Sequence, residues 1–425
     1  MAGLASPFAL PRHRTDASSP GLRPGVAHHA DGASLLVHAD PRAEPGAGRL
    51  KFSPVPMKQP RTILHLTSRL NGYGGTAMLR SLAASQSAAG ERVVVGALTA
   101  EKLPAHALRD QGVAVQKLGS RWPIDVIAIG RLARLRRKLV ADVTHAWDVR
   151  TLAQAALSGR RRPGSILIGS LLATGEATPW AIRVLRSIES RVTAFTVPEE
   201  SARERLTKLG IAPQRIHVIA PGVPRGGAGE RPHGRRMLLK ELGLGDESKL
   251  IAVSGPLRRH RQVDEAIWAF ELVRVIYPTA RLLVVGDGPD RARLERFAEQ
   301  TSEPGCVRFL GYRDDWRQLL PGVDVFWQLN ASVTTPLALL EAGAAGVPAV
   351  ASDVPAHRAA IVNDRTGMLV KLNDRAEAVR PTNDLIANPT RAERMGQAAA
   401  EHVAAKWSLD ATLSAFDRLY ERLIP

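Results

Sequence analysis

Short apolar runs alternate with glycine turns and helix-like segments between residues 281 and 369. The first run, Arg281 to Val285, ends in the turn Gly286-Asp287-Gly288-Pro289, and a charged amphipathic segment from Asp290 to Gln300 follows. Runs of the same kind occupy residues 307–310, 323–326 and 348–351. Apolar runs this short and this continuous are typical of buried parallel strands. The stretch therefore predicts an α/β domain with a parallel sheet.

The same alternation precedes this stretch. We expect strands at residues 62–67, 93–98, 113–118, 142–145, 165–168, 194–197 and 216–219, and a further strand at 250–254. The turn Gly72-Tyr73-Gly74-Gly75 follows the first of them and precedes a helix, so that backbone amides can approach a ligand. Because 425 residues with 44% hydrophobic content can build two cores, we predict two Rossmann-like lobes.

The chain is strongly basic. It has 58 Lys and Arg against 41 Asp and Glu, a formal net charge of +17, which favours anionic partners. The single cysteine, Cys306, excludes an internal disulfide framework. The sequence contains no long uncharged apolar run and no secretion signal at its start, so we expect a cytoplasmic protein, with the inner face of the membrane as an alternative location.

Composition also predicts the domain boundaries. Residues 1–57 are rich in Pro, Gly, Ala and Ser and are expected to be disordered, with translation from Met57 as an alternative hypothesis. We expect a first lobe at 58–225, a glycine- and proline-rich hinge at 226–234, and a second lobe at 235–407. A last helix is expected at 408–425.

Glu341 is the one acid in an alanine-rich helix predicted from Pro336 to Gly346. A charge on a helix that packs against a sheet is costly unless it is paired or lies at the open ends of the strands, where such folds bind ligands. Glu341 is therefore a candidate acceptor for sugar hydroxyls. The alternative is a surface or capping carboxylate.

Several ordered motifs surround Glu341. They are Phe309-Leu310-Gly311-Tyr312-Arg313-Asp314-Asp315, Leu339-Leu340-Glu341-Ala342, Ala345-Gly346-Val347-Pro348-Ala349-Val350 and Thr366-Gly367-Met368-Leu369-Val370. Together they resemble the donor-binding half of family 4 glycosyltransferases of the GT-B fold. The resemblance implies two Rossmann-like lobes with an interlobe cleft and a C-terminal crossover helix that returns to the first lobe. It also implies retaining transfer from a nucleotide-diphosphate sugar, without a protein nucleophile, metal or other cofactor.

The resemblance assigns donor-binding residues. It implies phosphate contacts for the glycine turn and for the loop after the first strand of the second lobe, a ribose contact for Glu341, and sugar contacts just before that helix. The residues are Gly74, Gly75, Gly255, Arg258, Arg261, Thr334, Thr335, Pro336, Leu337 and Glu341. Arginine can fork onto phosphate oxygens, although the loop could also be a solvated basic loop.

Departures from the family pattern keep a second hypothesis open. Pro256 replaces the usual arginine, Val333 replaces a glutamate that meets the donor sugar, and no histidine follows the strand that ends at Ile168. His145, at the end of an earlier strand, is the candidate catalytic residue, with a structural imidazole as the alternative. The rival to an envelope or exported-glycan glycosyltransferase is a catalytically silent nucleotide-sugar-binding scaffold or regulator.

The expected partners are a nucleotide-diphosphate sugar and a glycan or lipid-linked acceptor. The segment from Ile127 to Val140 is basic and amphipathic, so it either lies on an anionic membrane surface or is an ordinary lobe helix with solvated arginines. Nucleic acid is an unlikely partner, because the chain has charge but no recognised binding motif.

Overall fold

The computed structural model describes residues 60–119, 125–159, 162–172, 178–226, 230–332 and 336–424. The predicted disordered extension at 1–57 lies outside these residues, as do Thr334 and Thr335 of the predicted donor site.

The first lobe is built on one parallel sheet. In the described part of the lobe the strand order is β3-β2-β1-β4-β5-β6-β7. The strands are β1 (Thr62–Leu70), β2 (Arg92–Ala100), β3 (Ala114–Lys117), β4 (Val143–Ala146), β5 (Ile166–Ser170), β6 (Ala194–Val197) and β7 (Ile216–Val218). The helices are α1 (Gly75–Ala88), α2 (Lys102–Asp110), α3 (Val126–Leu139), α4 (Val149–Leu157), α5 (Pro179–Ile188) and α6 (Glu200–Lys208).

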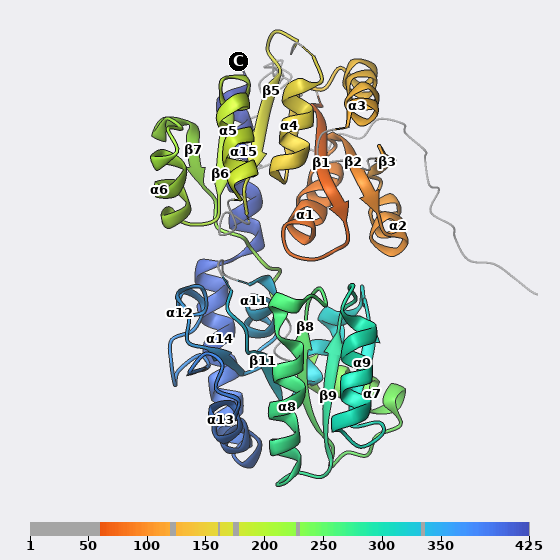
Figure 1. The fold of residues 1–425 in the computed structure, drawn as a ribbon, viewed down its shortest axis with the longest axis vertical. Coiled ribbons are helices and arrows are strands. Elements are labelled where there is room, and N and C mark those ends of the chain that lie inside the picture. The colour runs from red at the N-terminus through yellow and green to blue at the C-terminus, as the bar shows by residue number, and fades with distance from the viewer. Residues whose placement is uncertain are drawn as a thin grey trace, which may run out of the picture. The chain divides into compact units, whose positions relative to one another are not determined.

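The second lobe repeats this plan with the order β10-β9-β8-β11-β12-β13, again parallel. Figure 1 labels β8, β9 and β11 of this sheet. Its strands are β8 (Lys249–Ser254), β9 (Ala280–Val285), β10 (Val307–Gly311), β11 (Val325–Gln328), β12 (Ala349–Ser352) and β13 (Met368–Val370). Its helices are α7 (Arg231–Leu242), α8 (Val263–Arg274), α9 (Arg291–Thr301), α10 (Trp316–Leu319), α11 (Leu337–Ala344), α12 (Pro355–Ala360), α13 (Arg375–Ala387) and α14 (Pro389–Lys406).

Continuous burial explains the strands. In β8, Leu250, Ile251 and Ala252 have no exposed surface, as expected for a strand covered on both faces. The predicted strands are confirmed in both lobes, and their ends differ from the predicted ends by at most three residues. Cys306 is a buried free thiol beside β10. The prediction of two Rossmann-like lobes is therefore correct.

A last helix, α15 (Leu409–Leu423), belongs to the first lobe although it follows the second lobe in the chain (Figure 1). Phe416, Leu419 and Tyr420 are buried in the same core cluster as Ile63 of β1. The connection is fixed at its start, because the Leu409 amide donates to the Val223 carbonyl at 3.0 Å. The crossover helix implied by the family resemblance is confirmed.

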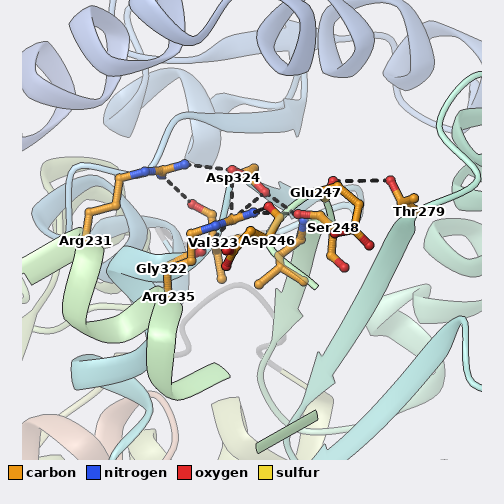
Figure 2. Close-up of polar contacts among 10 residues, drawn as sticks. Arg231, Arg235, Asp246, Glu247, Ser248, Thr279, Gly322, Val323 and Asp324 are labelled. Atoms are coloured by element: carbon orange, nitrogen blue, oxygen red, sulfur yellow. Dashed lines mark hydrogen bonds and ion pairs between the residues drawn. The ribbon is translucent and has the colours of Figure 1, made fainter. Parts of the chain in front are cut away.

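Asp324 fixes the start of the second lobe (Figure 2). Its carboxylate accepts from Arg231 at 2.7 Å, from Arg235 at 3.0 Å and from the Leu250 amide at 2.7 Å. These contacts attach α7 to the amino ends of β8 and β11. Residues 231–234, at the end of the predicted hinge, thus form the first turn of a helix that is anchored to the sheet.

Candidate functional site

A pocket of about 580 Å³ is lined by residues from both lobes. Its walls come from the turns that follow the carboxyl ends of β1, β8, β9, β10 and β11. In both sheets these turns surround the point where the strand order reverses, between β1 and β4 and between β8 and β11. Open parallel sheets bind ligands at this position. The pocket is therefore the candidate functional site.

The glycine turn of the first lobe contributes the start of α1. Gly74 is the N-cap residue and has φ 52°, a conformation that favours glycine. A Cβ on Gly75 would lie 3.1 Å from the side chain of Leu172, so the turn has little room for a larger residue. The first amides of a helix have no partner within the helix and can bind an anion. Gly74 and Gly75 both line the pocket.

Two glycines from neighbouring strand ends pack together in the second lobe. Gly255 and Gly286 have φ 133° and 137°, and a Cβ on Gly286 would collide with the carbonyl of Gly255. The turns after β8 and β9 can approach one another this closely only because Gly286 lacks a side chain. Gly255 was predicted from the sequence, whereas the role of Gly286 in shaping the pocket was not.

Arg261 lies over Gly255. A Cβ on Gly255 would be 2.7 Å from Nη2 of Arg261, which donates to the Ser254 carbonyl at 3.2 Å. Burial lowers the pKa of Arg261, yet no carboxylate within the described ranges forms an ion pair with it. A guanidinium withdrawn from water is costly without a counter-charge, which makes this side chain a candidate for binding an anion. Arg258 also lines the pocket and is exposed.

Gln262 connects the loop after β8 to the loop after β11. It has φ 49°, which is uncommon for a residue with a side chain. Its amide donates to Asn373 Oδ1 at 3.0 Å and accepts from the Ala331 amide at 3.3 Å. Asn330, adjacent to Ala331, lines the pocket. Gln262 thus holds two walls of the site in register.

Glu341 reaches the pocket from α11, and Pro336 and Leu337 line the pocket beside it. Its carboxylate is 19% exposed and forms an ion pair of 3.0 Å with Arg317 of α10. Core residues Leu339, Leu340 and Ala342 fix the helix beneath it. The structure therefore places Glu341 at the open ends of the strands and not on the outer surface of the lobe.

Two tyrosines link the lobes at the pocket. The Asp287 amide donates to the Tyr73 hydroxyl at 2.9 Å, and Arg80 donates to the Tyr312 hydroxyl at 2.6 Å. The two phenol rings meet edge to face with centroids 5.3 Å apart. Burial raises the pKa of both tyrosines, so they remain neutral donors and acceptors.

His145 does not line the pocket. It is fully buried, with Nδ1 2.6 Å from the Tyr420 hydroxyl and Nε2 2.6 Å from Ser170 Oγ. Burial lowers its pKa well below the usual range, so the imidazole is neutral. This placement matches the structural interpretation of His145, and we leave the residue out of the proposed site.

The pocket thus brings together all of the predicted donor residues that the structure describes. They are Gly74, Gly75, Gly255, Arg258, Arg261, Pro336, Leu337 and Glu341. Sequence reasoning did not single out several other lining residues, namely Tyr73, Arg80, Gly286, Tyr312, Arg317 and Asn330. Tyr73 and Tyr312 had a usable signal, since each is in a glycine turn after a predicted strand. Arg317 had none.

Sequence profiles of two families match the chain, one in each lobe. The profile for Glycosyltransferase Family 4 matches residues 73–225, and the profile for Glycosyl transferases group 1 matches residues 235–402.

Curated relatives are similar over different lengths. The chain is 27% identical over 350 residues to a GDP-mannose-dependent monoacylated alpha-(1-6)-phosphatidylinositol monomannoside mannosyltransferase of Corynebacterium glutamicum, covering 78% of this chain and 89% of that protein. It is also 27% identical to the N-acetyl-alpha-D-glucosaminyl L-malate synthase of Bacillus anthracis, covering 43% of this chain and 48%, or about half, of the relative.

The fold is similar to that of Anabaena HepE, solved in complex with UDP and glucose. The TM-score is 0.73 at 16% identity, and the match covers 85% of this chain and 100% of the other. At this identity the likeness concerns the fold alone. With a family profile matched in each lobe and the two-lobed architecture in place, the chain belongs to the family 4 glycosyltransferases of the GT-B fold.

Proposed function

We propose that this protein transfers a sugar from a nucleotide-diphosphate sugar to an acceptor, with retention at the anomeric carbon. The acceptor that we propose is an envelope or exported glycan, or its lipid-linked precursor. The GDP-mannose dependence of the Corynebacterium relative and the UDP in the HepE structure support a nucleotide-sugar donor. Uridine and guanosine diphosphate sugars are therefore the first donors to test.

One observation carries the proposal: the guanidinium of Arg261 lies in a pocket without a carboxylate partner among the described residues, and Glu341 lines the same pocket. A nucleotide diphosphate supplies both complements, because its phosphates are anionic and its ribose carries hydroxyl donors. We assign the phosphates to Gly74, Gly75, Gly255 and Arg261, and the ribose to Glu341. Pro336 and Leu337, with Thr334 and Thr335 from the sequence, would meet the sugar.

The same groups can stabilise the leaving group. As the glycosidic bond breaks, negative charge develops on the diphosphate. The positive end of α1 and the Arg261 guanidinium are fixed before the reaction and would stabilise that charge without rearrangement. Within the described ranges, no group of three or more His, Cys, Asp or Glu side chains has a metal-site arrangement.

A donor panel tests the proposal. We expect UDP-, GDP- and ADP-sugars to be discriminated by thermal shift, because a ligand that binds only the native state raises its apparent stability. The best donor should be consumed when glycan or lipid-linked acceptor pools are added, with the product anomer read by NMR. Glu341→Ala should lose a large part of the turnover. Full turnover in that variant, or transfer with inversion, would contradict the assignment.

The second candidate is a catalytically silent binder. The placement of His145 in the core, away from the pocket, and Val333 in the sequence favour it. It predicts the same thermal shift without consumption of any donor. Turnover on any acceptor pool eliminates it.

A membrane surface is the proposed location of a lipid-linked acceptor. Helix α3 packs Ala128, Leu132 and Leu139 inward, while Val126 and Ile127 are 82% and 65% exposed. Exposed apolar residues next to basic ones suit an anionic bilayer surface. Within the described residues, none of the helices is both long and apolar enough to cross a membrane.

A further inference from the structure

We propose that Arg317 is a positioning residue that holds Glu341 with one carboxylate oxygen free, so that this oxygen accepts from the ribose diol of a nucleotide. The inference rests on the proposed function, because it concerns the same pocket, and it assigns a role to a residue that the sequence did not single out. It predicts that loss of Arg317 lowers the affinity for nucleotides that carry both ribose hydroxyls more than the affinity for nucleotides that lack one of them.

The two side chains come from helices that the core holds in place. Arg317 lies on α10 between two core residues. Trp316, just before it, is 6% exposed, and Leu319, two residues after it, is fully buried. Glu341 follows the fully buried Leu340 on α11. Both Arg317 and Glu341 line the pocket. Their separation is therefore set by packing and does not depend on a mobile surface segment.

The hydrogen-bond geometry is one-sided. Nε and Nη2 of Arg317 both donate to Oε1 of Glu341, at 3.3 and 3.0 Å. No hydrogen bond to Oε2 is present among the described residues. Since the Glu341 side chain is 19% exposed and lines the pocket, Oε2 keeps acceptor capacity on the pocket side.

Several arginine and carboxylate pairs in this protein engage both carboxylate oxygens. Arg358 donates to both oxygens of Asp353, at 2.5 and 2.8 Å, and Arg313 donates to both oxygens of Asp315, at 2.8 and 2.7 Å. Arg375 also contacts both oxygens of Glu265. The fork that spans both oxygens is the usual arrangement for a guanidinium. The Arg317 pair instead engages a single oxygen, as do the pairs of Arg162 with Asp142 and of Arg391 with Asp364, but of these three pairs it is the one that lines the pocket.

The pair has two consequences for binding. A glutamate side chain loses rotamer freedom when it is ordered, and Arg317 imposes part of that order before the ligand arrives. An ionised carboxylate is also acceptor-only, so it suits two neighbouring hydroxyl donors. Nucleotides that lack a ribose hydroxyl should bind more weakly, and Arg317 should be needed for that discrimination.

The experiment measures the affinity of UDP and GDP, and of their 2′-deoxy and 3′-deoxy forms, by calorimetry. In the natural protein we expect the ribose forms to bind on the order of tenfold more tightly than the deoxy forms. Arg317→Gln should reduce this ratio toward one mainly by weakening the ribose forms, and Arg317→Lys should retain part of it. Glu341→Ala should abolish the ratio, and adding Arg317→Gln to it should change nothing further.

Arg391→Gln is the matched control, because Arg391 forms an ion pair with Asp364 in the same lobe at a similar exposure and does not line the pocket. It should keep the ribose preference. An equal loss for ribose and deoxy forms in Arg317→Gln would show direct ligand contact and would overturn the positioning role. If Glu341→Ala leaves nucleotide affinity unchanged, the proposed ribose site itself fails. Thermal unfolding of each variant excludes a folding defect.

Discussion

Arg261 is the residue on which the proposed diphosphate site depends most. We expect Arg261→Gln to weaken UDP or GDP binding by about tenfold to hundredfold, because a hydrogen bond to a charged group contributes about 1.5–3 kcal/mol. Uridine and guanosine, which lack phosphates, should show no comparable loss. Calorimetry on the nucleoside and diphosphate pairs measures the difference.

The neighbouring Arg259 provides the control. It is exposed, lies two residues away in the same basic loop and does not line the pocket. Arg259→Gln removes the same charge and should leave diphosphate affinity within about twofold, since an exposed charge is screened by solvent. Equal losses in the two variants would mean that net charge and not the placement of Arg261 is responsible.

Buried imidazoles predict a pH dependence of stability. Burial lowers the pKa of His65 to about 4 and of His357 to about 4, and lowers that of His145 well below 6.5. In the unfolded chain these side chains take up protons near pH 6.5. The free energy of unfolding should therefore fall as pH drops from 6.5 towards 4, by up to about 3 kcal/mol for each of His65 and His357, and His145 should act in the same direction.

Unfolding curves in guanidinium chloride, recorded between pH 7.5 and 4.5, measure this fall in the free energy of unfolding. Stability should not change above pH 7 through these groups, because the imidazoles are then neutral in both states. NMR signals of the three imidazoles in the folded protein should not titrate near pH 6.5. If they do, the buried placement is wrong.

At the scale of single elements, α3 combines exposed apolar side chains with exposed basic ones. We expect the protein to float with vesicles that contain anionic phospholipid and not with neutral vesicles, and the binding to weaken as salt rises. Replacing Arg134, Arg137 and Lys138 by glutamine should reduce the bound fraction by at least about tenfold, since each cation near such a surface contributes about 1 kcal/mol.

The control removes three exposed cations from the second lobe, Arg236, Lys240 and Arg296. It has the same net charge as the α3 variant. Flotation that falls equally in both variants would assign the effect to total charge, and α3 would then be an ordinary lobe helix.

The local pattern of apolar and polar residues predicted which segments are strands and which are helices. The strand predicted at residues 194–197 has the bounds found in the structure, and the last helix, expected at 408–425, runs from Leu409 to Leu423. The strand predicted from residue 62 ends at residue 67, because the polar residues Ser68 and Arg69 interrupt the apolar run. In the structure β1 continues for three more residues, to Leu70. The sheet still continues there, since Arg69 pairs with Thr99 and Leu70 with Ala100 of β2. Pairing between strands, which periodicity does not report, sets the end.

At the scale of the whole molecule, α15 supplies part of the first lobe's core from the far end of the chain. Phe416 is 2% exposed and lies against His145 and Trp147, with ring centroids 5.4 and 5.7 Å apart. Phe416→Ala should destabilise the first lobe by about 3–5 kcal/mol, through lost transfer energy and the cavity left behind.

Hydrogen exchange measures the two lobes separately. Protection should fall at amides of β1 and β4 and remain nearly unchanged in β8 and β9. Ser414→Ala, an exposed position on the same helix, should change neither lobe by more than about 0.5 kcal/mol. Loss of protection confined to the second lobe would contradict the crossover packing.

The sequence predicted those site residues whose signal lies in the residues next to them along the chain. Gly74, Gly75 and Gly255 follow strands in glycine turns, and Glu341 is one acid on an apolar helix, so both signals are visible within a few residues of sequence. Arg317 escaped notice, because a single arginine in a short charged segment has no pattern of its own. Its meaning depends on Glu341, 24 residues away.

The sequence by itself determined the alternation of strands, turns and helices, since burial and backbone conformation act over neighbouring residues. It did not determine which side chains would share one volume. His145 is the next-to-last residue of β4, whose carboxyl end faces the site, yet Tyr420, 275 residues later, lies over it and keeps it in the core. Only the tertiary structure decided that contact, because packing joins residues without regard to their distance along the chain.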